Sequence, residues 1–314
     1  MEREIRGPRK DEMLCAAREY IAASNTTRPL SLGVLSKKYK CKRATISKYV
    51  KYLGGTVENH STCPGFNRNV FDIIDTEEKA YWLGFLYADG CITENNYIEL
   101  GVHTQDYDVM QKYRKFLDFP SDESIKFVKN KNVCRVRFHN DHVADMLVQK
   151  GCVRRKSLIL TFPDLKIFSN TNLVYDFIRG YCDGDGCLRF YKNGKGAVTC
   201  DISFVGTKPF IQKMMEFLNV PGGVFRNCSS KNNITEVYSV LYRCTSGRKV
   251  ARLLYENATV YMNRKYNKFL EFCRFEQECS RAKSSKISRR WDANTEVSSE
   301  ITKGSETPQR VGIE

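Results

Sequence analysis

Two acidic residues in this sequence stand where they could bind a metal ion together. "KAYWLGFLYADGCI" (Lys79–Ile92) and "LVYDFIRGYCDGDGCL" (Leu173–Leu188) each carry an apolar run, a small residue, Asp-Gly and another apolar residue. Hard divalent cations prefer carboxylate oxygens, and a bound cation can activate water for phosphodiester hydrolysis. Asp-Gly is also common turn chemistry, so one such end alone would carry little information. Two matching ends make Asp89 and Asp185 candidate catalytic residues and metal ligands.

The residues before the two acids predict how they would be brought together. Each stretch is apolar nearly all round, which is typical of a buried helix. Each also has small residues four positions apart, Gly84 with Ala88 and Gly180 with Gly184. This spacing puts the small residues on one helix face and lets two helices approach more closely than the usual ~8–10 Å between axes. We expect the two helices to pack on each other by pseudo-two-fold symmetry, with the acids side by side.

Two acids held side by side require a positive charge between them. Like charges repel, and the carboxyl ends of two helices add partial negative charge. The expected cofactor is therefore Mg²⁺, or another divalent cation such as Mn²⁺. An EF-hand loop is a weaker alternative, because Asp183 and Asp185 fit its start but Gly194 occupies the position of its closing Glu.

The overall composition favours a polyanionic partner. The 314 residues carry a formal net charge of +15, and such a balance points to nucleic acid. A hydrophobic content of 41% excludes wholesale disorder. The 13 cysteines are an odd number without a Cys-x-x-Cys pair, which indicates reduced thiols in an intracellular protein. No segment predicts a signal peptide or a membrane span, so we expect a location in the cytoplasm or in the DNA-containing compartment of the host.

Residues 1–55 resemble a helix-turn-helix DNA-binding domain. Two amphipathic helical patterns are joined by the short turn "KCK", and the stretch 28–57 contains eight basic residues and no Asp or Glu. Lys40 stands where a small turn residue is usual. If the second helix enters the major groove, the contacts to bases or phosphates are Lys42, Arg43, Thr45 and Lys48. An ordinary basic helical hairpin is the alternative.

Beyond a linker over 56–70, the chain repeats one order of elements. Residues 71–168 and 169–276 each predict a helix, two strands, a helix, two strands and a helix. The predicted fold class is α+β: two pseudo-symmetric αββαββα repeats packed through their first helices, after a small all-α domain at the N-terminus. Strands with one polar face predict half-buried antiparallel sheets. The polar residues 277–314 predict a disordered tail.

Both acidic motifs carry a family resemblance. "WLGFLYADG" (Trp82–Gly90) and "IRGYCDGDG" (Ile178–Gly186) resemble the nine-residue LAGLIDADG motif. Two copies in one chain look like the monomeric LAGLIDADG homing endonucleases. The resemblance covers 71–275, about two-thirds of the chain. The family's metal-binding acid is the eighth motif position, which falls on Asp89 and Asp185.

The resemblance implies a function and further site residues. It implies a monomeric, metal-dependent endonuclease that binds a long non-palindromic site on double-stranded DNA, leaves 3′ overhangs and spreads a mobile genetic element such as an intron. It implies a basic residue near each scissile phosphate, for which the candidates are Lys156 and Lys265, with simple phosphate contact or surface solubility as alternatives. Its sheets form a DNA-binding saddle over the major groove. The expected strand contacts are Arg135, Arg137, His139, Arg189 and Tyr191.

Two other functions are compatible with the same sequence. An intron maturase would keep the fold and the basic face, bind intron RNA and have no need of the acids. A catalytically inactive DNA-binding regulator should have lost an acid, and neither is missing. The intact pair favours the enzyme over the regulator and leaves the maturase open.

Overall fold

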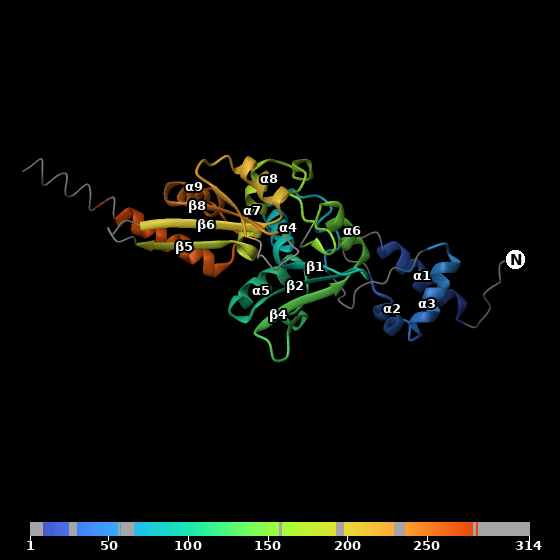
Figure 1. Cartoon of the computed structure of the whole chain (residues 1–314). Coiled ribbons are helices and arrows are strands. Elements are labelled where there is room, and N and C mark those ends of the chain that lie inside the picture. Colours follow the sequence, from blue (N-terminus) through green and yellow to red (C-terminus); the bar gives the residue numbers. More distant parts are fainter. Residues whose placement is uncertain are drawn as a thin grey trace, which may run out of the picture.

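In the computed structural model, three N-terminal helices precede two helix-and-sheet repeats (Figure 1). The structure describes residues 9–24, 30–55, 57, 66–156, 159–192, 198–228, 236–278 and 281. None of the helices in these ranges is long and apolar enough to cross a bilayer. Helices α4 and α7 lie at the centre, between the two sheets (Figure 1).

The three N-terminal helices share an apolar core of their own. They are α1 (Lys10–Ser24), α2 (Leu32–Lys38) and α3 (Arg43–Tyr52). Leu35 of α2 and Ile46 and Val50 of α3 are fully buried in this core. Between α2 and α3, Lys40 has a φ of 43°, in the left-handed region that favours glycine. The backbone therefore makes a tight turn despite the lysine, and the helix-turn-helix function stays a prediction.

The first repeat contains three helices and a four-stranded antiparallel sheet. Its elements are α4 (Glu77–Asp89), β1 (Gly90–Ile92), β2 (Tyr97–His103), α5 (Tyr107–Phe116), β3 (Ile125–Phe127), β4 (Val133–His139) and α6 (Asp141–Gln149). The strand order is β1-β2-β4-β3. The pairing of β2 with β4 runs from Tyr97 opposite His139 to His103 opposite Val133.

The second repeat has the same order of elements. They are α7 (Asn172–Asp185), β5 (Cys187–Lys192), β6 (Val198–Gly206), α8 (Lys208–Leu218), β7 (Val224–Asn227), β8 (Tyr238–Arg243) and α9 (Cys244–Tyr255). The strand order β5-β6-β8-β7 matches that of the first sheet. A further helical stretch, 263–278, packs Phe272 on Phe190 of β5, with ring centroids 4.6 Å apart. The predicted αββαββα order is confirmed in both halves.

Each sheet buries one face and leaves polar side chains on the other. Along β4, the buried residues Cys134, Val136 and Phe138 alternate with Arg135, Arg137 and His139. This is the period-two pattern of a half-buried strand. Strand β6 departs from it, because Thr199 and Asp201 lie on the polar face yet are only 6% and 3% exposed. Side chains of the neighbouring strands contact Asp201, which explains its burial.

Helices α4 and α7 pack backbone against backbone. A Cβ added to Gly84 would lie 1.9 Å from the carbonyl oxygen of Phe177, and one added to Gly180 would lie 1.9 Å from that of Tyr81. No side chain fits at such a distance, so both positions require glycine. A Cβ on Gly184 would lie 2.4 Å from the Cβ of Ala88. The four small residues singled out in the sequence therefore lie at this helix contact.

The observed packing differs from the predicted linker, and most of the predicted tail is not described by the structure. Phe66 and Val70, within the predicted linker over 56–70, are buried in the main core. The Phe66 ring lies 5.3 Å from that of Phe119, so these apolar residues belong to the first repeat although Gly, Asn and Pro surround them. The predicted tail over 277–314 lies outside the described residues except for 277, 278 and 281, which are helical.

Replacing Gly180 by alanine should destabilise the protein strongly. The added Cβ would meet a backbone carbonyl that cannot move without separating α4 from α7. We expect a loss of about 3 kcal/mol or more in the free energy of unfolding, at the upper end for overpacked cores. Chemical denaturation of the full chain would measure it.

The matched control is Gly101→Ala on β2. A Cβ there would be no closer than 3.4 Å to its neighbours. We expect a change within about 1 kcal/mol, in the stabilising direction. Equal effects of the two substitutions would contradict the backbone contact described here.

Candidate active site

The two acids occupy matching positions at the ends of the central helices. Asp89 is the last residue of α4, and Asp185 is the last residue of α7. A Cβ on Gly184 would lie 3.2 Å from Oδ2 of Asp89, so the Asp89 carboxylate rests against the backbone just before Asp185. Both side chains remain exposed on one side. Neither accepts a hydrogen bond from the residues that the structure describes.

The surroundings of this site raise the pKa of both acids. Loss of hydration, followed by the charge of Asp185, raises the pKa of Asp89 to about 6. Loss of hydration also raises the pKa of Asp185. Lys156 and Lys265 oppose both shifts, so each lysine charge acts on both acids. The acids are therefore held together against their mutual repulsion.

Lys156 binds the carboxyl end of α4. Its Nζ donates to the carbonyl oxygen of Tyr87 at 2.5 Å and to that of Ala88. A cation is favoured there, because the last carbonyls of a helix carry partial negative charge. Burial lowers the pKa of Lys156. An ammonium group has three N–H bonds, and one of those on Lys156 has no partner among the described residues.

Lys265 binds the carboxyl end of α7 in a similar way. It is only 6% exposed. Its Nζ donates to the carbonyl oxygens of Cys182 at 2.5 Å, Asp183 at 2.9 Å and Gly186 at 2.7 Å. All three of its N–H bonds are used. Both predicted lysines thus lie beside the acids, and surface solubility does not explain either of them.

Asp183 differs from Asp185 although only one residue separates them. Asp183 is 1% exposed and accepts hydrogen bonds from Tyr81 Oη at 2.8 Å, Tyr255 Oη at 2.7 Å and the Met262 amide at 2.7 Å. Burial raises the pKa of Asp183, and Lys265 together with these donors opposes that shift. Asp183 is therefore a structural acid with all its bonds made, whereas Asp185 is left open.

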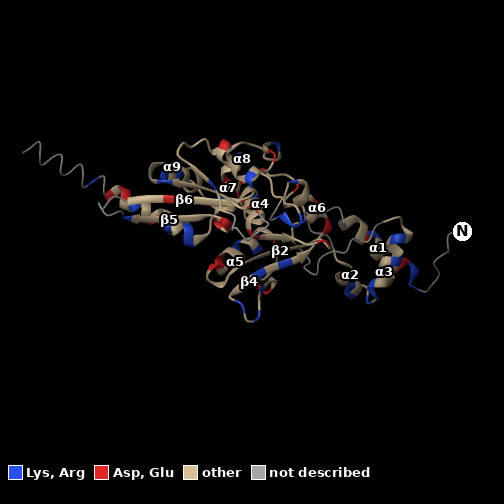
Figure 2. Cartoon of the chain, in the orientation of Figure 1, with Lys and Arg blue, Asp and Glu red and all other residues tan. Residues whose placement is uncertain are grey.

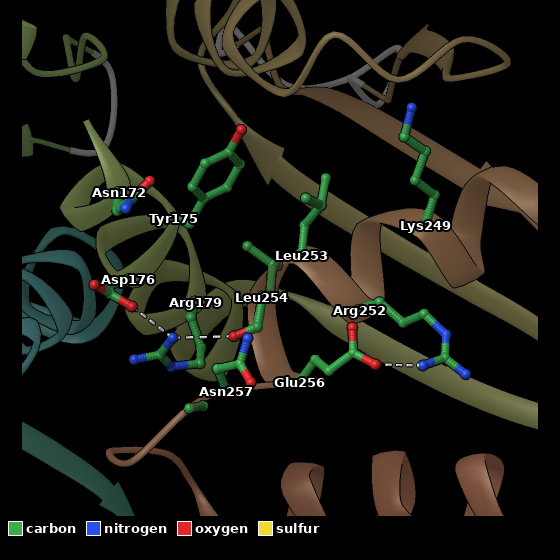
Figure 3. Close-up of a pocket in the computed structure, with 11 residues that line it drawn as sticks. Asn172, Tyr175, Asp176, Arg179, Lys249, Arg252, Leu253, Leu254, Glu256 and Asn257 are labelled. Carbon is green, nitrogen blue, oxygen red and sulfur yellow. Dashed lines mark hydrogen bonds and ion pairs between the residues drawn. The ribbon is translucent and has the colours of Figure 1, made fainter.

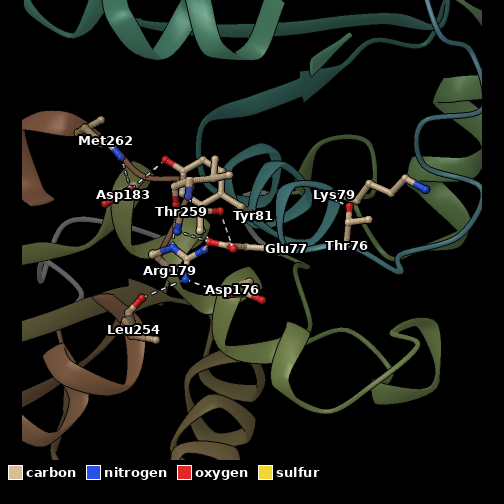
Figure 4. A network of polar contacts seen from close by, with 11 residues as sticks. Thr76, Glu77, Lys79, Tyr81, Asp176, Arg179, Asp183, Leu254, Thr259 and Met262 are labelled. Carbon is tan, nitrogen blue, oxygen red and sulfur yellow. Dashed lines mark hydrogen bonds and ion pairs between the residues drawn. The ribbon is translucent and has the colours of Figure 1, made fainter. Parts of the chain in front are cut away.

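A buried ion network anchors the segment that leads to Lys265 (Figure 4). Arg179 of α7 pairs with Glu77 of α4 at 2.7 Å and donates to the Val260 carbonyl at 2.9 Å. Glu77 also accepts from the Thr259 amide at 2.7 Å. Nothing in the sequence singled out Glu77, since an acid in the first turn of a helix is ordinary.

The same segment also reaches across to the first repeat. Arg264 binds both carboxylate oxygens of the buried Asp106, at 2.9 and 3.0 Å. Lys112 of α5 donates to the Tyr261 carbonyl at 2.6 Å and to Asn263 at 2.7 Å. Residues of the first repeat therefore fix the position of the second lysine.

The strand residues predicted to contact DNA lie on the polar faces of the two sheets. Arg135, Arg137 and His139 are on β4, and Arg189 and Tyr191 are on β5. Figure 2 shows Lys and Arg residues along β4 and on the N-terminal helices. Sequence reasoning missed Arg243, the last residue of β8, which joins Arg189 beside Asp201.

The residues predicted to contact DNA from the N-terminal domain lie at the start of α3 and along it. Lys42, Arg43 and Lys48 are exposed and Thr45 is half-buried. A Cβ on Gly33 would lie 3.0 Å from the Arg43 guanidinium, so Arg43 folds back over α2. Lys42 and Lys48 are the more open of these basic residues.

The two acids could bind a hard cation if another molecule supplied further oxygen ligands. Within the described ranges, no group of three or more His, Cys, Asp and Glu side chains gathers. Mg²⁺ is commonly bound by one or two carboxylates together with waters and substrate phosphate oxygens. Asp89 and Asp185 have the right chemistry for the protein's share of such a site.

A cavity of about 520 Å³ lies elsewhere, between α7 and α9 (Figure 3). Four charged residues of its lining form ion pairs, Arg179 with Asp176 at 2.8 Å and Arg252 with Glu256 at 2.6 Å. Neither acid of the candidate site lines it. This cavity is therefore separate from the chemistry described above.

Solved structures similar to this chain include LAGLIDADG homing endonucleases. The meganuclease I-SmaMI bound to DNA is 9% identical, with a TM-score of 0.41 over 62% of this chain and 87% of that chain. The LAGLIDADG homing endonuclease I-GzeII, in complex with its DNA target, is 12% identical, with a TM-score of 0.38 over 66% and 91%. No protein-family model and no curated protein matches the sequence.

Replacing Asp89 by asparagine should stabilise the metal-free protein at high pH. A carboxyl with a pKa of about 6 in the folded state and 3.8 in the unfolded state binds its proton more tightly when folded. The wild type therefore loses stability as the pH rises from about 4 to about 6. We expect Asp89→Asn to melt at a higher temperature than the wild type at pH 8 in EDTA, and the two to converge near pH 4.

Asp145→Asn, on the exposed side of α6, controls for the loss of one negative charge. Thermal melts at both pH values measure the difference. A melting temperature for Asp89→Asn below that of the wild type at pH 8 would contradict this expectation, because it would show that the Asp89 carboxylate stabilises the folded state.

Proposed function

We propose that this chain is a site-specific endonuclease of the LAGLIDADG homing type, which cuts double-stranded DNA with a divalent metal. The observation that carries the proposal is the meeting of Asp89 and Asp185 at the ends of two glycine-packed helices. The described chain gives neither acid a hydrogen bond, although their repulsion and lost hydration cost stability. Such an arrangement serves a ligand rather than the fold.

The charges of the site suit a phosphodiester substrate. A divalent cation bound by the acids would activate water and stabilise the leaving oxygen. Asp89 and Asp185 hold the cation-binding position, and Lys156 and Lys265 offset their charge. The protein side of the site is then close to neutral, so a phosphate and a dication can enter together without a large electrostatic penalty.

The two lysines have different roles in this proposal. Lys156 has one N–H bond left over and can donate it to a phosphate oxygen. Lys265 has none left, so it acts through its charge and by fixing the end of α7. Loss of Lys156 should therefore slow cleavage, whereas loss of Lys265 should also lower stability.

The polar faces of the two sheets are the proposed DNA-binding saddle. Arginine side chains are held there by ion pairs, as for Arg135 with Glu99 at 2.9 Å. The N-terminal helices would add phosphate contacts outside the saddle, through Lys42 and Lys48. A net charge of +15 supports binding to a polyanion over this whole length.

Cleavage is tested with the full chain, Mg²⁺ and total DNA from the source organism. We expect discrete staggered breaks with 3′ overhangs when the new ends are sequenced. The Asp89→Asn/Asp185→Asn double variant should cut at roughly one-thousandth of the wild-type rate, because a catalytic metal supplies several kcal/mol. Asp145→Asn is the matched control and should cut normally.

Protein that binds DNA tightly but never cuts it would contradict the endonuclease. The maturase and the inactive regulator would then be the functions to test, and binding to intron RNA would test the maturase. Unchanged cleavage by the double variant would instead remove the two acids from the mechanism.

The N-terminal contribution is tested by the salt dependence of DNA binding. Each phosphate contact contributes about 0.9 to the slope of log K against log salt. Lys42→Ala/Lys48→Ala should weaken binding to all sequences alike and make the slope shallower by up to about two. Lys38→Ala is the matched control, because Glu19 at 2.7 Å already neutralises this lysine. An unchanged slope in the double variant would exclude these contacts.

A further inference from the structure

On the first sheet, one acid holds two arginines. Glu99 of β2 lies 2.9 Å from Nη1 of Arg135 and 3.6 Å from Nε of Arg137, both on β4. The Arg137 guanidinium also lies 4.6 Å from the centre of the Tyr97 ring. These contacts reduce the freedom of the two arginines, called here the first arginine pair, before any ligand arrives.

The second sheet carries a similar arrangement on different residues. Oδ2 of Asp201 on β6 lies 3.6 Å from Nη2 of Arg189 on β5 and 3.8 Å from Nε of Arg243 on β8. Asp201 stands directly opposite both arginines in the strand register. The arginine side chains, the second arginine pair, are 61% and 58% exposed. Oδ1 of Asp201 is buried and has no hydrogen-bond partner within the described residues.

An acid between two arginines suits a base edge better than a phosphate. A carboxylate at the centre of the group repels a phosphate but leaves the outer N–H bonds of the guanidinium groups free. Guanine presents two acceptors in the major groove, O6 and N7, which match the guanidinium fork. The chemistry of both groups therefore matches a G·C pair.

The two arrangements lie at different distances from the acids of the active site. Glu99 stands opposite Cys91, which is the second residue after Asp89. Asp201 stands opposite Arg189, which is the fourth residue after Asp185. A strand rises by about 3.3 Å per residue, so the second group lies about 7 Å farther along its strands. At about 3.4 Å per base pair, this offset corresponds to about two base pairs.

We propose that the two arginine pairs read G·C base pairs at unequal distances from the cut, the second pair about two base pairs farther out than the first. Glu99 and Asp201 act as positioning residues that orient the arginines. The inference rests on the proposed function, since it takes the sheets as the surface that binds DNA. It specifies which base pair is read in each half of the DNA site and how far that base pair lies from the cut. Neither follows from the repeated order of helices and strands.

The test uses a DNA library built on a cleavage site found with the full chain, in which every base pair is varied. Sequencing of the cut molecules should reveal, in each half of the site, one or more adjacent base pairs with a guanine preference of about tenfold or more, called here a block. This preference is the size expected of one good bidentate contact. The distances of the two blocks from the centre of the cut should differ by about two base pairs. Arg189→Gln/Arg243→Gln should remove the preference only in the outer block.

Matched variants separate base reading from general binding. Asp201→Asn should reduce the preference in the outer block while Arg189 and Arg243 still bind DNA. Lys213→Gln on α8 removes an exposed positive charge that is paired with Glu216 at 2.7 Å. It should leave the preference unchanged. Blocks at equal distances, or an outer block that survives Arg189→Gln/Arg243→Gln, would overturn the inference.

Failure of the proposed function gives a different result. If the wild type cuts no DNA, capture of randomised duplexes in EDTA replaces cleavage as the readout. Arginine-dependent G·C blocks in the captured DNA would then keep the inference and remove only the nuclease. Capture without such blocks, or no capture at all, would overturn the inference itself.

Discussion

The contact between the backbones of α4 and α7 is the constraint on which the rest of the structure depends. Gly84 and Gly180 allow the two helices to touch without side chains between them. Their carboxyl ends are then forced together, each bearing an acid and several carbonyl groups with partial negative charge. Lys156 and Lys265 bind those carbonyls. The two lysines thereby offset part of the negative charge that gathers where the helix ends meet.

The two repeats share an order of elements but differ in chemistry. At the sixth motif position, the first repeat has Tyr87, whose hydroxyl donates to the Lys150 carbonyl at 2.6 Å, and the second has the buried Asp183. Lys265 makes three hydrogen bonds to its helix end, whereas Lys156 makes two. The site is therefore pseudo-symmetric in shape and asymmetric in charge.

Much of this organisation could be predicted from the sequence, because it depends on local patterns of residue types. Small residues four apart, alternating polarity in the strands and the repeated Asp-Gly ends are all periodic signals. The structural role of Asp183 could not be predicted, since its partners Tyr81, Tyr255 and Met262 are distant in the chain. The sequence also left open what Lys265 binds, because that depends on where a loop crosses between repeats.

The segment over 256–264 makes the order of synthesis matter. It belongs to the end of the second repeat, yet it binds Glu77 and Asp106 of the first. A ribosome releases the chain from its N-terminus, so Glu77 and Asp106 emerge well before Lys265. Until then the end of α7 lacks its cation and the first repeat lacks its crossing contacts. The candidate active site can therefore form completely only after nearly the whole core has left the ribosome.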